Sequence, residues 1–208
     1  MYDDADSLVV DSNPAVKRAW TVTVDAIDAG LSAKLAAWTP EWSAAFGQGT
    51  FATIVCPAWM TSYIESNAPD ASGLWDVAAV PGGAGSMGGS HLALPRQGSH
   101  PQEAYDFISW LTAPEQQLKV FKATGNFPST PSLYDSPDLT EFSKPYFNDA
   151  PIGKIFTASA LELKPQHQGP KQGDVFNTIG AGLGRVEQGK QSADEAWRQV
   201  LSDVASLA

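Results

Sequence analysis

The chain has 208 residues, 43% of them hydrophobic and 17% charged, so it can fold around a sizeable core. Its formal net charge of −10 excludes a general attraction to nucleic acid or anionic lipid, since both are negatively charged. The single cysteine, Cys56, excludes an intrachain disulfide and a zinc site made of thiolates, and we expect it to be a small buried apolar residue.

The first predicted helix starts at Pro14, after a capping asparagine, and stops at Gly30. A second, short helix is predicted near Pro40. Three aromatic residues spaced four apart share one face of this region: Trp38, Trp42 and Phe46.

Three short apolar segments are predicted to be strands. Residues 50–56 are rich in β-branched and aromatic residues and end at Pro57, which cannot donate to a sheet ladder. Residues 75–80 and 91–94 also end at prolines, and the glycine-rich loop 82–90 separates them. With the helices, these segments predict a mixed α/β fold.

Trp59 follows the first predicted strand and precedes a run, residues 58–65, that suits the first turns of a helix. A rigid corner that presents an aromatic ring suits a flat, hydroxyl-rich ligand, because a sugar offers one apolar face to stack on the ring. The alternative is that Trp59 is a core residue.

The second half of the chain is predicted to be mainly helical. Ser99 with Gln102 and Thr112 with Glu115 have the spacing of capping boxes, and the second of these helices stops at Gly125. The first of them has an apolar face made of Ala104, Phe107, Ile108 and Leu111.

Residues 126–151 are predicted to form an ordered crossing loop with one short helix near 140–147. Residues 175–186 are predicted to be helical. Ser192 and Glu195 form a third capping box, ahead of a terminal helix.

Few motifs indicate catalysis. Gly83, Gly85 and Gly88 spell GxGxxG, but a nucleotide fingerprint needs a helix to follow, and an apolar β-like segment follows instead. The three histidines lack metal-ligand spacing, and no GxSxG nucleophile motif is present. Scattered carboxylates leave a glycoside hydrolase open as an alternative, because the sequence shows no distance between them.

Several segments together resemble the family 1 extracellular solute-binding proteins of ABC sugar importers, most closely the cellobiose and cello-oligosaccharide type. They are GTFATIVCPAWMTSYI (49–64), WDVAAVPGG (75–83), SHPQEAYDFISWLTAPEQQ (99–117), GNFPSTPSLYDSP (125–137), PYFNDAPIGKIF (145–156), LKPQHQGPKQGDV (163–175) and RVEQGKQSADEAW (185–197).

This resemblance implies an α/β, type II periplasmic-binding-protein-like fold that is incomplete. The chain would supply the C-terminal lobe plus the segment returning to the N-terminal lobe. Residues 1–80 and 150–208 would form the two parts of the C-terminal lobe, and residues 81–149 the returning segment. The missing N-terminal part of the same receptor would carry the signal and the lipid anchor of an extracytoplasmic, cell-surface lipoprotein.

The resemblance also implies site residues. Trp59 matches a sugar-stacking tryptophan, and Phe176 falls at a second aromatic platform. Either Trp38 or Trp42 approaches the cleft. The remaining matched residues are the turn Gly89, Ser90 and His91, and the polar residues Gln168 and Asp174 beside the crossover.

The function so implied is non-catalytic: binding of an oligosaccharide, with cellobiose or a cello-oligosaccharide expected, and delivery to ABC permease subunits in the membrane. No cofactor, metal or nucleic acid is expected. A glycoside hydrolase or a non-transport lectin domain is the alternative.

Overall fold

The computed structural model describes residues 1–207, and these residues form two compact units. Unit 1 contains residues 1–36 and 165–207, and unit 2 contains residues 37–164. The assignment of the predicted segments to two lobes of a receptor stays a prediction.

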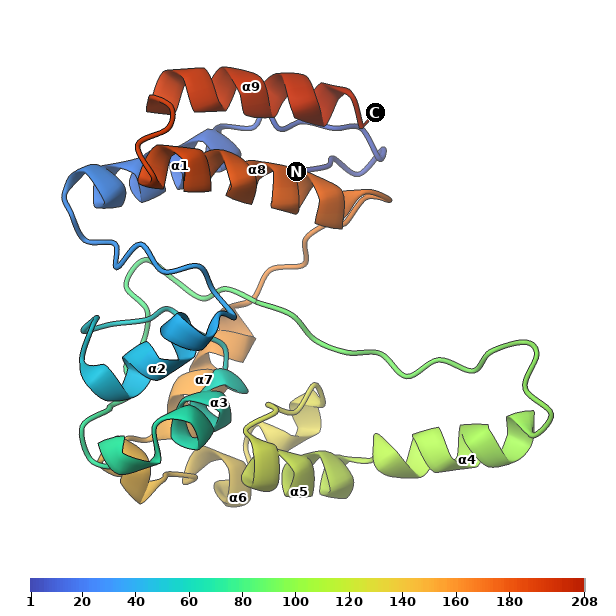
Figure 1. Ribbon diagram of the computed structural model, residues 1–208. Helices are drawn as coiled ribbons and strands as arrows, with labels where there is room; N and C mark the ends of the chain where they lie inside the picture. Colours follow the sequence, from blue (N-terminus) through green and yellow to red (C-terminus); the bar gives the residue numbers. More distant parts are fainter. Residues whose placement is uncertain (208) are drawn as a thin grey trace. The chain divides into compact units, whose positions relative to one another are not determined.

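Unit 1 contains three helices: α1 (Pro14–Asp28), α8 (Gln172–Glu187) and α9 (Ala193–Ala205). The last two lie side by side and antiparallel, as Figure 1 shows. Their apolar faces and that of α1 enclose one core, made of Val10, Trp20, Val24, Val175, Ala196, Val200 and Val204. The predicted helix over residues 175–186 is therefore confirmed, three residues longer at its N-terminus than predicted.

Two predicted helix starts in unit 1 are confirmed by their caps. The side chain of Asn13 accepts a hydrogen bond from the backbone N–H of Ala15, at 2.9 Å, ahead of Pro14. Ser192 and Glu195 form the reciprocal bonds of a capping box at the start of α9. Both arrangements satisfy N–H groups that the first turn of a helix leaves without a partner.

Unit 2 is built from six α-helices and three 3₁₀ turns. The helices are α2 (Pro40–Gln48), α3 (Met60–Asn67), α4 (Pro101–Leu111), α5 (Pro114–Thr124), α6 (Pro137–Thr140) and α7 (Ile152–Glu162). The 3₁₀ turns are η1 (Pro69–Ala71), η2 (Pro131–Leu133) and η3 (Pro145–Phe147). Its largest fully buried side chains are Phe46, Phe121, Phe147, Leu139 and Ile152.

Two predicted capping boxes in unit 2 are wrong. Pro101 and Pro114 are the first residues of α4 and α5, so the N-cap positions fall on His100 and Ala113, and neither gives a side-chain cap bond. Proline favours the first helical position because its φ is already helical and its missing N–H would be unpaired there. The predicted stop at Gly125 is confirmed, since this residue is the left-handed C-cap of α5.

The three predicted strands are also wrong. Residues 50–56, 75–80 and 91–94 lie outside regular structure, and within residues 1–207 the only β-bridge joins Tyr2 to Leu8. A strand requires a neighbouring strand to pair its N–H and C=O groups. Several apolar side chains that the pattern predicts to be buried are also exposed, Val55 by 76%, whereas Phe51 and Trp75 are partly buried against Phe46.

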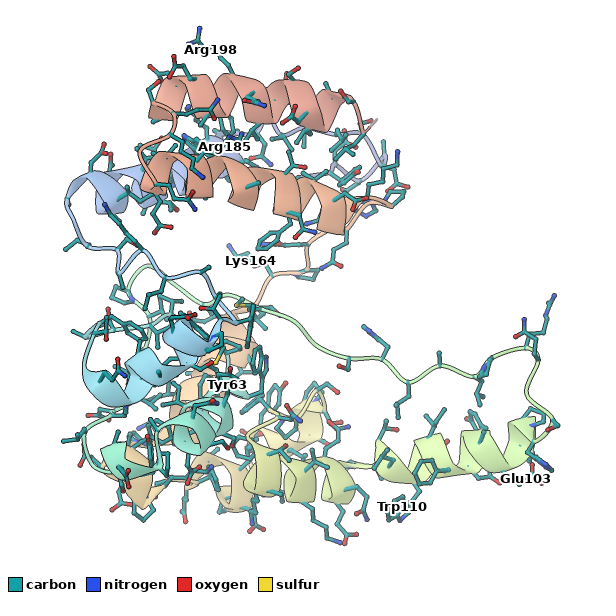
Figure 2. All side chains as sticks on the ribbon, viewed as in Figure 1. Tyr63, Glu103, Trp110, Lys164, Arg185 and Arg198 are labelled. Carbon is teal, nitrogen blue, oxygen red and sulfur yellow. The ribbon has the colours of Figure 1, made fainter. Side chains whose placement is uncertain are left out.

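Helix α4 likewise leaves without a fully buried residue the apolar face that its sequence pattern predicts to be packed: Phe107 is exposed, and Ala104, Ile108 and Leu111 are partly buried. None of its residues is buried, and Phe107 and Trp110 stack on each other at 6.0 Å between ring centroids while both remain exposed. Figure 2 shows Trp110 on this helix.

Candidate functional site

Aromatic side chains of α2 and α3 form a cluster in unit 2. Trp42 is buried, with its ring centroid 4.8 Å from that of Phe46 and 5.8 Å from that of Tyr63. Tyr63, labelled in Figure 2, is held by its hydroxyl, which lies 2.8 Å from the hydroxyl of Ser43. The four-residue spacing of the buried Trp42 and Phe46 on α2, with the partly buried Tyr63 of α3 against both, therefore places an aromatic base between the two helices.

Trp38 lies on the outer side of this base, just before α2. Its ring centroid is 5.1 Å from that of Trp42, and it meets the ring of Tyr63 edge-on at 5.5 Å. Its side chain is 56% exposed, and its backbone is left-handed, with φ of 69°. For a bulky residue this conformation is strained, at a cost on the order of 1–3 kcal/mol, and such strain concentrates at functional sites.

Trp59 occupies the N-cap position of α3 and is half-buried. Its ring is nearly parallel to that of Trp38, with an angle of 18° and a centroid distance of 6.0 Å. Its indole N–H donates a long hydrogen bond, 3.4 Å, to the carbonyl oxygen of Met87. The two tryptophans form a stacked aromatic pair, and the indole of Trp59 is also bonded to the backbone of another segment.

That segment is the glycine-rich loop 82–90. Gly88 has φ of 84°, and a Cβ built on it would lie 3.8 Å from the indole nitrogen of Trp59. Glycine adopts this backbone conformation without steric cost. The predicted site residues Gly89, Ser90 and His91 follow directly and are exposed.

The other predicted site residues, Gln168, Asp174 and Phe176, belong to unit 1. All three are exposed, and Phe176 presents 63% of its surface from the first half of α8. Their roles stay predictions.

The structure thus brings together Trp38, Trp42 and Trp59. Trp38 is exposed, whereas Trp42 is buried. Tyr63 and Met87 are not among the site residues that the sequence predicts. Tyr63 had a usable signal, because it lies four residues after Trp59 and so on the same side of α3. The contact of Met87 had no signal, since it depends on the path of a glycine-rich loop.

The cluster consists of aromatic side chains and, within the part of the chain that the structure describes, contains no arrangement of residues that could hold a metal ion. Among residues 1–207, no group of three or more His, Cys, Asp or Glu side chains is placed to hold a metal ion. Cys56, three residues before Trp59, is a free thiol. Burial raises the pKa of this thiol. None of the helices described is long and apolar enough to cross a membrane.

Comparison with known proteins identifies the family. The sequence matches the family described as bacterial extracellular solute-binding protein over residues 1–145. A crystal structure of an extracellular solute-binding protein of family 1 is 45% identical, covers 99% of this chain and 53% of its own, and superposes with a TM-score of 0.88. No curated protein matched the sequence.

A second structure is 22% identical and covers 93% of this chain and 51% of its own, with a TM-score of 0.78. It is the ABC transporter associated binding protein from B. animalis subsp. lactis Bl-04 in complex with beta-1,6-galactobiose. The chain therefore spans about half the length of both matched structures. The predicted fold class is confirmed, since the chain has the fold of part of an α/β solute-binding protein. On these matches the chain belongs to the bacterial extracellular solute-binding proteins.

Proposed function

We propose that this chain is part of the substrate-binding component of an ABC importer and that it binds an oligosaccharide, with cellobiose or a cello-oligosaccharide as the ligand. The observation that carries the proposal is the pair Trp38 and Trp59, which lies on a buried aromatic base in a member of a solute-binding family. A neighbour of the same fold is a complex with a galactose disaccharide, which supports a sugar as the ligand class.

The roles of the residues follow from their exposure. Trp59 is the stacking platform, because it is half-buried, fixed by its indole hydrogen bond and located at a helix start. Trp42 supports the platform from within the core. The exposed polar groups of Ser90, His91, Gln168 and Asp174 are proposed to bond sugar hydroxyls, and Phe176 to offer a second aromatic surface.

Titration of Trp59→Ala in the intact receptor tests the proposal. Loss of an aromatic anchor typically costs at least about 2 kcal/mol, which corresponds to an affinity for cellobiose roughly thirtyfold lower. Isothermal titration and thermal melting are carried out on the same preparation. The matched control is Trp42→Ala, for which we expect mainly a lower melting temperature, since truncating a buried tryptophan costs about 3–5 kcal/mol of stability. A Trp59→Ala protein that melts much earlier but binds cellobiose unchanged would mean that Trp59 is a core residue.

We further propose that the receptor acts without catalysis, is anchored outside the cytoplasm as a lipoprotein and delivers its ligand to membrane permease subunits. Family membership supports the extracytoplasmic location. Incubation with cellotetraose, followed by analysis of reducing ends, tests the first point: a receptor returns the sugar intact, whereas a hydrolase releases shorter products.

A further inference from the structure

The spacing of Trp38 and Trp59 is too small for a sugar between them. A ring held between two aromatic faces needs about 3.5–4.0 Å on each side, or roughly 7–8 Å between the two faces. The centroids here are 6.0 Å apart and the planes are tilted by only 18°. In this conformation the ring of Trp38 therefore covers one face of the Trp59 ring.

Trp38 also has the features of a side chain that can leave. It is 56% exposed, whereas Trp42 beneath it is 8% exposed. Its left-handed backbone at φ 69° is a conformation that tryptophan rarely adopts, so departure from it releases strain. Trp59, in contrast, is tied to the carbonyl oxygen of Met87 and precedes a helix, so it stays in place when Trp38 moves.

We propose that Trp38 is an intramolecular gate over Trp59: in the free protein its indole covers the stacking face, and the ligand must displace it. This proposal rests on the proposed function. It makes Trp38 a specificity-determining residue, because the ligand has to replace an aromatic contact with an apolar face of its own. A sugar ring has such a face, and a small ion or a fully polar solute does not.

The gate predicts the sign of a mutational effect. Only the protein molecules in which Trp59 is uncovered can bind the ligand, so the apparent affinity is the intrinsic affinity multiplied by the uncovered fraction. Removal of the cover therefore strengthens binding. An aromatic pair of this kind accounts for a roughly 2- to 13-fold change in affinity. We therefore expect Trp38→Ala to bind cellobiose about 2- to 13-fold more tightly than the unmodified chain, and Trp38→Phe to lie between the two.

The matched control is Trp110→Ala. Trp110 has the same exposed fraction, 56%, but lies on α4 and stacks on Phe107. We expect its replacement to leave cellobiose affinity unchanged. Weaker binding by Trp38→Ala would show that Trp38 is a platform and not a gate. Unchanged binding would also overturn the proposal. In both cases the sugar-binding function would stand.

Circular dichroism gives a second readout that is independent of affinity. Two stacked indoles couple their electronic transitions and give a paired positive and negative band in the ultraviolet. Trp20 and Trp197 are a second close indole pair, with ring centroids 5.0 Å apart, so the readout is a difference spectrum. We expect the contribution of Trp38 to be present in the free protein, absent in Trp38→Ala and reduced when cellobiose is added to the unmodified chain. A band pair that cellobiose leaves intact, although titration shows binding, overturns the gate alone. Absence of binding by the unmodified chain and by Trp38→Ala, also after each is joined to the part of the 45% identical relative that the chain does not match, overturns the proposed function, and the gate with it.

Discussion

At the scale of single residues, the absence of a side chain at Gly182 allows α8 to pack closely against α1 and α9. A Cβ built on Gly182 would lie 2.3 Å from a methyl carbon of Val200 on α9 and 3.3 Å from the ring of Trp20 on α1. Both neighbours are buried in the core of unit 1, so neither can move aside freely.

We expect Gly182→Ala to destabilise the protein by about 1–3 kcal/mol, because overpacking forces side chains out of their preferred rotamers. Gly180→Ala is the matched control in the same helix, since a Cβ there meets nothing within 4 Å. It should stabilise by up to about 1 kcal/mol through helix propensity alone. Urea unfolding monitored by circular dichroism measures both, and equal effects of the two substitutions would contradict the packing argument.

At the scale of elements, the capping box fixes the start of α9. The side chain of Ser192 accepts from the backbone N–H of Glu195, and the Glu195 carboxylate accepts from the backbone N–H of Ser192 at 3.0 Å. Ser192→Ala removes one half of this exchange. We expect it to cost about 1 kcal/mol of unfolding free energy at neutral pH, measured by urea titration.

The same box predicts a pH dependence. The side chain of Ser192, followed by its backbone N–H, lowers the pKa of Glu195 in the folded state. A lowered folded pKa means that this contribution is complete above the usual glutamate pKa and disappears as the pH falls through the lowered value. The cost of Ser192→Ala should therefore shrink in acid. A cost that stays constant across this range would show that the carboxylate has no part in the cap.

At the scale of the whole molecule, the chain spans 53% of the 45% identical structure that it matches. A ligand cleft normally buries 70–90% of a small ligand, which requires walls on more than one side. We expect the 208 residues alone to bind cellobiose more weakly than micromolar. Joining them to the part of the 45% identical relative that they do not match should raise the affinity. Isothermal titration of both proteins tests this, and micromolar binding by the 208 residues alone would contradict it.

The apolar surface of unit 2 gives the same experiment a second readout. Val80, Leu92, Phe107 and Trp110 are all exposed in segments whose patterns predict burial. We expect the joined protein to bind less of a hydrophobic dye than the chain alone, because new contacts would cover this surface. Equal dye binding would show that these residues are surface in both proteins.

The sequence by itself determined those helix ends that depend on capping residues close to one another in the chain. The starts of α1 and α9 could be predicted because their caps join residues only two or three positions apart, and the end of α5 because Gly125 tolerates a left-handed backbone. The cluster of Trp38, Trp42 and Phe46 was predictable for the same reason. Helix α7, which has no capping side chain at its start, was not predicted.

Tertiary structure alone decided the rest. The segments 50–56, 75–80 and 91–94 have the composition of strands, but a strand exists only where a distant segment supplies its hydrogen-bonding partner, and residues 1–207 supply none for them. The stacking of Trp38 on Trp59 and the bond from Trp59 to Met87 join residues 21 and 28 positions apart. No local pattern encodes such contacts, because they depend on how α2, α3 and the glycine-rich loop pack together.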